Sequence, residues 1–246
     1  GGYVGRGNIA IPGLPYGILE GELIRRDYGS LDGTDHTQVH WDDRTGYTPI
    51  VNANGGYQFL GYGVIGNPQP DYVYGVTNTL SYKWATLRVQ FDSQVGGDVF
   101  STTNSTLLGR GILQETDFDR FVPVVTNGLS ADGTPNTTQT TANAHYWPNT
   151  GVFYDENSIY DASVMRLREV SLSFVAPKSF LNGTPFGNAS LTLSAQNIWH
   201  YAWNTPSGTN FDPEVISYGA GSNARGFDEM TGPTAKKYGA TLSLTF

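Results

Sequence analysis

The stretch Lys237-Tyr238-Gly239-Ala240-Thr241-Leu242-Ser243-Leu244-Thr245-Phe246 alternates between apolar and polar residues along its whole length. Its apolar positions are Tyr238, Ala240, Leu242, Leu244 and Phe246, and the positions between them are Lys, Gly, Thr and Ser. Because successive side chains of a β-strand point to opposite faces, this pattern predicts a strand with one apolar and one polar face.

The same alternation recurs upstream. Its apolar positions are Leu191, Leu193 and Ala195 in one segment, Val170, Leu172 and Phe174 in the next, and Leu87, Val89 and Phe91 with Tyr72, Tyr74, Val76, Leu80 and Tyr82 in the two arms of a hairpin. We therefore expect strands over residues 72–82, 84–95, 164–176, 189–201 and 236–246. Residues 57–64 and 16–26 are weaker strand candidates.

The residues on the polar faces distinguish a membrane barrel from a soluble sandwich. They are Ser, Thr, Gly and Gln with an occasional charge, where a soluble sheet carries more Lys and Glu. The apolar faces end in aromatic residues, as expected of the girdles at the two interfaces of a lipid-facing band. The chain is 13% aromatic and 15% charged, against about 25% charged in a typical soluble domain. The prediction is an all-β fold, an antiparallel transmembrane β-barrel.

The connections between the expected strands alternate in length. Residues 82–84 and 177–188 give short turns, whereas residues 96–161 and 204–236 are long, aperiodic and rich in Thr, Asn, Asp, Gly and Pro. Outer-membrane barrels have short periplasmic turns and long extracellular loops. With Phe246 at the periplasmic side, both long stretches fall outside the cell. The predicted localisation is the bacterial outer membrane.

Composition excludes several function classes. The net charge is −8 with no basic stripe, so we expect no nucleic-acid partner. There is no Cys, hence no disulfide or thiolate metal site, and we expect no cofactor. No apolar run of about 18 residues is long enough for a spanning helix. Gly1 opens the chain without a leader pattern or an initiator Met, so we expect a piece of a longer protein.

Four segments together resemble SusC/RagA-type TonB-linked outer-membrane receptors. They are residues 65–72 (IGNPQPDY) with 78–83 (NTLSYK), residues 159–174 (IYDASVMRLREVSLSF), residues 191–199 (LTLSAQNIW) and residues 212–215 (DPEV). Their order and spacing also fit, and the likeness covers most of the chain, best from about Gly61 onward.

The resemblance implies a TonB-dependent transporter of the Bacteroidetes type, with a barrel of about 22 strands around an N-terminal plug. Such a protein imports oligosaccharides or peptides, is lidded by a SusD-like lipoprotein and draws energy through TonB. Residues 1–246 then form the C-terminal segment of one β-barrel domain, roughly six to eight strands, without the plug, the first strands or the region that contacts TonB. The implied partners are outer-membrane lipid, the SusD-like lipoprotein, the TonB complex and the barrel-assembly machinery. The chain is expected not to be an enzyme.

Candidate site residues fall into two groups. Substrate-contact candidates are His145, Tyr146 and Trp147 in the first long loop, and Arg88 and Asp92 on the polar face of a strand. Tyr238, Leu242, Leu244 and Phe246 are the candidate assembly signal, since barrel families resemble this chain in ending on an alternating strand with a terminal aromatic.

Other readings of the sequence remain open. Asp32, Asp35, His36, His40, Asp42 and Asp43 could form a calcium site in a loop, although their spacing is not that of an EF-hand. Carboxylate neighbours such as Asp155 with Glu156 and Asp212 with Glu214 could be glycosidase pairs, but solvated loop residues are the commoner case. A soluble secreted β-sandwich that binds carbohydrate or acts as an adhesin, and a passive porin, are the alternative functions.

Overall fold

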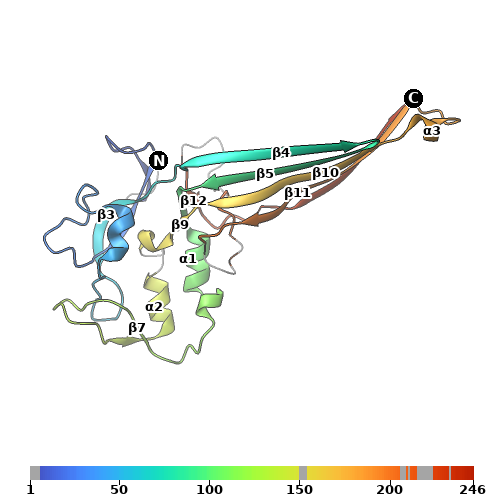
Figure 1. Ribbon diagram of the computed structural model, residues 1–246. Coiled ribbons are helices and arrows are strands. Elements are labelled where there is room, and N and C mark those ends of the chain that lie inside the picture. The colour runs from blue at the N-terminus through green and yellow to red at the C-terminus, as the bar shows by residue number, and fades with distance from the viewer. Residues whose placement is uncertain (1–5, 150–153, 206–208, 210, 215–223, 233) are drawn as a thin grey trace.

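The computed structural model describes residues 6–149, 154–205, 209, 211–214, 224–232 and 234–246. These residues form two parts that lie end to end (Figure 1). One is a long five-stranded sheet, here called the wall. The other, here called the loop body, comprises the described residues of 6–71, 96–163 and 202–235, which gather at one end of the wall.

The wall contains the five strands that the alternation predicts. They are β4 (Tyr72–Tyr82), β5 (Ala85–Val95), β10 (Val164–Val175), β11 (Asn188–Tyr201) and β13 (Lys237–Thr245). Their order across the sheet is β13-β11-β10-β5-β4, and every neighbouring pair is antiparallel. Each expected boundary agrees with the observed one to within a residue. Strands of 9 to 14 residues are long enough to cross a bilayer, which takes about 9–11 tilted residues.

Short and long connections leave the wall at opposite ends. Lys83 and Trp84 alone join β4 to β5, with Lys83 in the left-handed region at φ 51°. Residues 176–187, which include the short helix α3 (Lys178–Leu181), join β10 to β11 at the same end. Residues 96–163 and 202–236 leave from the other end, and their described parts lie in the loop body. The predicted separation of short turns from long loops is confirmed.

The two outer strands are open edges. Every residue of β4 and of β13 is exposed, and among the described residues each of the two pairs with a strand on one side only. An open edge presents unpaired N–H and C=O groups, which lipid cannot satisfy. The wall is therefore an arc of a barrel and not a closed one.

The strand register shifts part-way up the wall. Leu167 of β10 lies opposite Phe91 of β5 and Trp199 of β11, and Glu169 lies opposite Gln90 and Gln196. The two paired positions are thus one residue apart on β5, two residues apart on β10 and three residues apart on β11. Arg168 is the extra residue of β10 relative to β5, and Asn197 in β11 has a positive φ of 52°. Such β-bulges bend the strand and increase its twist.

The loop body is built from short elements. Its strands are β1 (Gly7–Ile9), β2 (Ile18–Ile24) and β3 (Phe59–Gly66) in one sheet, β6 (Asp98–Ser101), β9 (Ile159–Asp161) and β12 (Phe227–Asp228) in a second, and β7 (Val124–Val125) with β8 (Gln139–Thr140) in a third. Its helices are α1 (Thr102–Gly109), α2 (Ala142–Asn149) and the 3-10 helices η1 (Trp41–Gly46), η2 (Gln114–Thr116) and η3 (Asp155–Ser158). The weak strand candidates in 16–26 and 57–64 are β2 and β3. The helices were not predicted.

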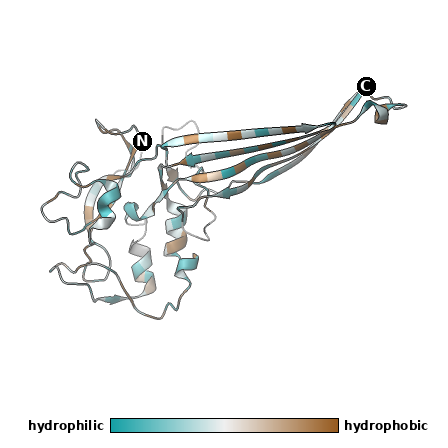
Figure 2. Cartoon of the chain, viewed as in Figure 1, coloured by the Kyte–Doolittle hydropathy of each residue, from teal (hydrophilic) through white to brown (hydrophobic). Residues whose placement is uncertain are grey.

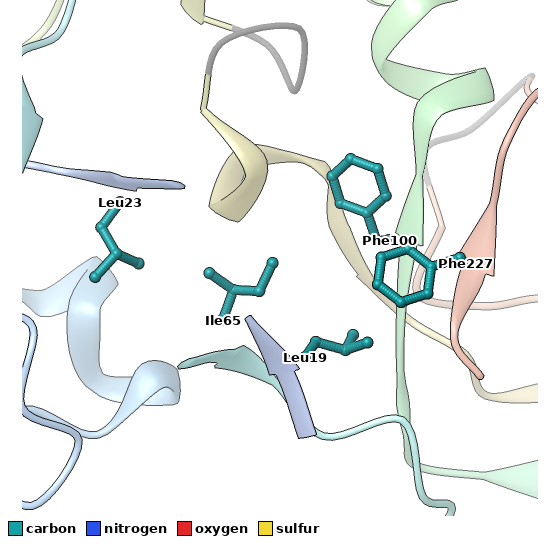
Figure 3. Packing of buried hydrophobic residues seen from close by; sticks show 5 residues of the cluster. All are labelled: Leu19, Leu23, Ile65, Phe100 and Phe227. Atoms are coloured by element: carbon teal, nitrogen blue, oxygen red, sulfur yellow. The ribbon is translucent and has the colours of Figure 1, made fainter. Parts of the chain in front are cut away.

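The main hydrophobic core lies in the loop body and not in the wall. Leu19, Leu23, Ile65, Phe100 and Phe227 pack together there, each at most 5% exposed (Figure 3). They come from β2, β3, β6 and β12, so this core joins segments that are far apart in the sequence. None of the described helices is both long and apolar enough to cross a membrane.

Candidate functional site: the two faces of the wall

The register aligns the alternating residues of the five strands into continuous rows. One row runs Tyr82–Ala85–Phe174–Leu191–Leu242, and the next runs Leu80–Leu87–Leu172–Leu193–Ala240. Nearer the loop body, Val76, Phe91, Leu167 and Trp199 align in the same way. The wall thus has one apolar face. Figure 2 shows how hydrophobic residues alternate with more hydrophilic ones along β4.

The apolar face is uncovered. Leu80 is 63% exposed, Leu242 66% and Tyr238 75%, and no second sheet packs over them among the described residues. Exposed apolar surface of this extent marks an interaction site in a soluble protein and a lipid contact in a membrane protein. If the chain were a soluble β-sandwich, Leu87, Val89 and Phe91 would pack in a core. They do not, since Phe91 is exposed and the other two are partly exposed.

Aromatic side chains bound this face at both ends. Near the loop body, Tyr72 stacks on Tyr74 with ring centroids 6.2 Å apart, and Trp199 stacks on Tyr201 at 6.4 Å. At the turn end, the exposed aromatics are Tyr82, Trp84, Phe180 and Phe246. The nine residues from Tyr74 to Tyr82 span about 27 Å along the strand, which at a tilt of about 40° corresponds to a height of about 21 Å, of the order of the apolar band of about 25 Å in outer-membrane barrels. Aromatic residues therefore lie at both ends of the apolar face, as the sequence predicted.

The opposite face of the wall is polar, and hydroxyl side chains meet across its strands. Ser81 and Thr86 lie 3.1 Å apart through their hydroxyl oxygens, and Ser173 and Thr192 lie 2.9 Å apart. Nearer the loop body this face becomes charged. Its charged residues in the described strands are Arg88, Asp92, Arg166, Arg168, Glu169 and Lys237.

An ion-pair cluster ties a long loop to the charged part of this face. Arg168 donates from Nε and Nη2 to the two carboxylate oxygens of Asp92 at 2.8 and 2.7 Å. Its Nη1 and Nη2 also donate to Glu214 at 2.9 and 2.8 Å. Arg166 pairs with Asp212, and its Nη1 lies 3.0 Å from Glu214 Oε2. Asp92, Arg166, Arg168, Asp212 and Glu214 are together called the arginine cluster.

The arginine cluster is buried at its centre and open at its rim. Arg166 is 4% exposed and Asp212 2%, whereas Glu214 is exposed. The backbone N–H of Glu214 also donates to Asp212 at 3.1 Å, and the hydroxyl of Thr234 donates to the other oxygen of that carboxylate. The Asp-Pro-Glu segment noted in the sequence is thus held in one place against the wall. Removing one member of a buried pair leaves an uncompensated charge, which makes this anchor hard to break.

The two wall candidates, Arg88 and Asp92, lie on the same polar face, four residues apart on β5. Both carboxylate oxygens of Asp92 are occupied by Arg168. Arg88 sits opposite Ser171 and Thr79, and no ion pair involves it within the described part of the chain. The sequence predicted that Asp92 lies on this face and noted Glu214 as a loop carboxylate, but it did not predict that Arg168 pairs with both, because these pairs depend on a bulge and on a loop 46 residues further along.

The other candidates lie in the loop body, on α2. His145 Nδ1 lies 2.9 Å from the hydroxyl of Thr126, and burial lowers the pKa of this imidazole. Tyr146 lines a pocket of about 120 Å³ with Phe118 and Arg120, and its ring centroid lies 5.9 Å from that of Phe118. The side chain of Trp147 lies outside the described residues. The structure therefore separates these residues from Arg88 and Asp92 into a second region.

The acidic loop and the carboxylate neighbours have structural partners. Asp32 accepts from the N–H and hydroxyl of Thr34, and Asp35 does the same with Thr37, which lowers the pKa of each carboxyl. No group of three or more His, Asp or Glu side chains among the described residues has the arrangement of a metal site. Of the carboxylate pairs, Asp155 binds Arg6, Glu156 binds Arg26 and Asp212 binds Arg166.

Comparison with curated proteins gives two relatives of one kind. The chain is 26% identical over 213 residues to TonB-dependent receptor P3 of Formosa agariphila, and 27% identical over 192 residues to TonB-dependent receptor P26 of the same organism. This chain resembles TonB-dependent receptors. The matches cover 80% and 74% of the chain but 18% of each receptor, so the chain spans about a fifth of the length of these TonB-dependent receptors. No family profile matches it.

Solved structures give the same fold. The RagAB peptide importer in its closed-closed state aligns with this chain at a TM-score of 0.54 and 17% identity. The alignment covers 98% of this chain and 25% of the importer chain. The open-open state of the same importer aligns at a TM-score of 0.53. At this identity the likeness concerns the fold alone, which is that of a TonB-dependent receptor barrel. Receptors and transporters of this kind are not enzymes, in agreement with the expectation for this chain.

Proposed function

We propose that this chain forms part of the wall and of the outer loops of a TonB-dependent transporter in a bacterial outer membrane. The observation that carries the proposal is the exposed apolar face between two aromatic bands, backed by a polar face with charged residues. Lipid contacts the first face and the transport lumen lies against the second. The turn end then faces the periplasm and the loop body faces the outside.

The open edges of β4 and β13 support a larger barrel. Each edge needs a neighbouring strand, since lipid cannot pair with the free backbone groups. We propose that the remaining strands, the plug and the TonB-contacting region belong to the rest of the same protein. The four residues of the candidate assembly signal are exposed at the turn end or on the apolar face: Tyr238, Leu242, Leu244 and Phe246. This exposure supports the proposal that the assembly machinery binds them before the barrel closes.

The proposed cargo is an oligosaccharide or a peptide, captured with a SusD-like lipoprotein on the loop side. RagAB, which shares the fold, is described as a peptide importer. In this chain the contact candidates are Arg88 on the polar face and Tyr146 beside its pocket. Arg88 offers a donor to a carboxylate or a sugar hydroxyl, and Tyr146 offers a ring and a hydroxyl.

The test is uptake by cells that carry the full-length protein. Labelled oligosaccharides and labelled peptides are supplied to a deletion strain complemented with the wild-type gene, with and without TonB. We expect uptake of one class only, and only when TonB and the proton motive force are present. Uptake that persists without TonB contradicts the proposal and favours a passive porin. A protein that stays in solution without detergent favours the soluble binding module.

A second uptake measurement tests the contact candidates. Arg88→Gln and Tyr146→Ala are expected to raise the substrate concentration for half-maximal uptake by roughly tenfold, the effect of losing about one charge-assisted contact. Ser171→Ala, at the cross-strand partner of Arg88, is the matched control and should leave uptake unchanged. If both test variants transport normally, substrate passes elsewhere in the lumen.

A further inference from the structure

An apolar pocket of about 280 Å³ lies on the wall at the end away from the loop body. Its lining includes Trp84, Phe174, Pro177, Phe180, Leu191 and Leu242. Phe174, Leu191 and Leu242 belong to one row of the apolar face, so the pocket opens on the side that we propose to contact lipid.

The two short turns build this pocket. Trp84 belongs to the two-residue turn between β4 and β5, and its ring centroid lies 5.6 Å from that of Phe174. In the turn between β10 and β11, Pro177 precedes α3, which carries the exposed ring of Phe180. The pocket therefore needs side chains from both turns as well as from the ends of the strands.

Two lysines neighbour the pocket in the sequence. Lys83 and Lys178 are sequence neighbours of the lining residues Trp84 and Pro177. The Nζ atom of Lys83 lies 5.1 Å from the ring centroid of Tyr82, which places this ammonium on the apolar face. Residues 77–91, 170–194 and 239–246, which form this end of the wall, contain no Asp or Glu.

We propose that the pocket binds an acyl chain of an anionic phospholipid, with Lys83 and Lys178 at its phosphate. An apolar cleft rimmed by aromatics and lysines matches a molecule with an apolar tail and a negative head at an interface. Juxtamembrane lysines bind anionic lipid with about 1 kcal/mol each, roughly a fivefold change in affinity. The inference rests on the proposed function, since that function places the turn end in the inner leaflet.

The test uses fluorescence quenching of Trp84 by brominated acyl chains. The full-length receptor is reconstituted in phosphatidylcholine vesicles that contain increasing fractions of brominated phosphatidylglycerol or of brominated phosphatidylcholine. The signal of Trp84 is the difference between wild type and Trp84→Phe. We expect this signal to saturate at a lower fraction of phosphatidylglycerol than of phosphatidylcholine.

Charge variants identify the source of the preference. Lys83→Gln and Lys178→Gln should each weaken the preference for phosphatidylglycerol about fivefold. Lys236→Gln removes an exposed lysine at the other end of the wall and is the matched control. Equal quenching of Trp84 by both lipids, or a preference unchanged in the double lysine variant, overturns the inference.

The remaining tryptophans separate failure of the pocket from failure of the membrane assignment. Trp199 is exposed on the apolar face, so brominated phosphatidylcholine quenches it whenever that face contacts lipid. If other tryptophans are quenched while Trp84 is protected from both lipids, a protein segment covers the pocket, and only the lipid inference fails. If no tryptophan is quenched, the proposed function fails as well.

Discussion

The wall exposes its apolar side chains, whereas the loop body buries them. In the wall, Leu80 and Leu242 are exposed on a single sheet, and none of the described residues covers them. In the loop body, Leu19 and Phe100 are fully buried in a core built from several short elements. The apolar residues of the wall are suited to contact with lipid, whereas those of the loop body pack against one another. The loop body therefore obeys the rules of a soluble domain, although it continues directly from strands suited to lipid.

Loss of a core ring should affect the loop body alone. Phe100→Ala removes a fully buried aromatic, which typically lowers the free energy of unfolding by about 3–5 kcal/mol. Hydrogen exchange of peptides from 18–24 and 98–109 in the full-length receptor measures this loss. Phe121→Ala, at a loop ring that is 97% exposed, is the control. Equal loosening of β10 and β11 would show that the two regions unfold as one unit.

A charge should damage the wall on one face only. Leu193→Arg places a guanidinium on the apolar face, which costs about 2–4 kcal/mol near the bilayer midplane. Ser194→Arg changes the next residue, on the polar face, and should have little effect on the free energy of unfolding. Reversible urea unfolding of the receptor in lipid vesicles compares the two. Similar losses for both variants would contradict the assignment of the faces.

Acid should stabilise the loop body through Asp98. Burial raises the pKa of this carboxyl to about 6, partly offset by the backbone N–H of Asn67, which donates to it at 2.6 Å. Since the folded pKa lies above the unfolded one, the contribution is complete below about pH 4 and is lost as the pH rises through about 6. Asp98→Asn should therefore raise the free energy of opening of the loop body at pH 7.5 by up to about 3 kcal/mol.

Hydrogen exchange between pH 4 and 7.5, corrected for the intrinsic exchange rate, checks that sign. The difference between wild type and Asp98→Asn should vanish toward pH 4. Asp132→Asn removes an exposed loop carboxylate and is the control that leaves the pH dependence in place. A variant that is less protected than wild type at pH 7.5 would mean that ionised Asp98 is stabilising.

The smallest expected effect concerns the junction of the two regions. Asp92→Asn removes one carboxylate from Arg168, whose side chain is 30% exposed and keeps Glu214 as a partner. The loss should be about 1 kcal/mol, as for other partly exposed pairs. Faster exchange in residues 211–214 is the readout. Glu169→Gln, on the same face of β10, serves as control, and an equal effect there would indicate general electrostatics.

The sequence predicted the wall well because its determinants are local. Alternation over 9 to 14 residues fixes each strand, and the turn at Lys83 and Trp84 fixes the hairpin. The loop body depends on contacts between distant segments, such as Phe100 with Phe227, which no local pattern reveals. Helix α1 had one local sign, the side chain of Ser101, which accepts from the N–H of Asn104. Its Thr-rich sequence otherwise reads as loop.

The candidate site was predicted only in part for the same reason. Arg88 and Asp92 follow from period two along β5. The pairing of Asp92 with Arg168 does not, because it depends on which strand lies beside β5, and the pairing of Arg168 with Glu214 depends on the course of a loop. Local periodicity gives the face of a residue, whereas the register between strands gives its neighbours.

The register shift gives neighbouring strands of the wall unequal lengths over the same part of the sheet. Between the same paired positions, β10 holds one more residue than β5, and β11 holds two more. A strand takes up such extra residues by bending and twisting more strongly. Deleting Arg168 together with Asn197 and Ile198 would leave the apolar and polar order of every strand intact. It would also equalise the three strands and remove the guanidinium that pairs with Asp92 and Glu214. The three inserted residues thus allow the sheet to curve close to where it meets the loop body.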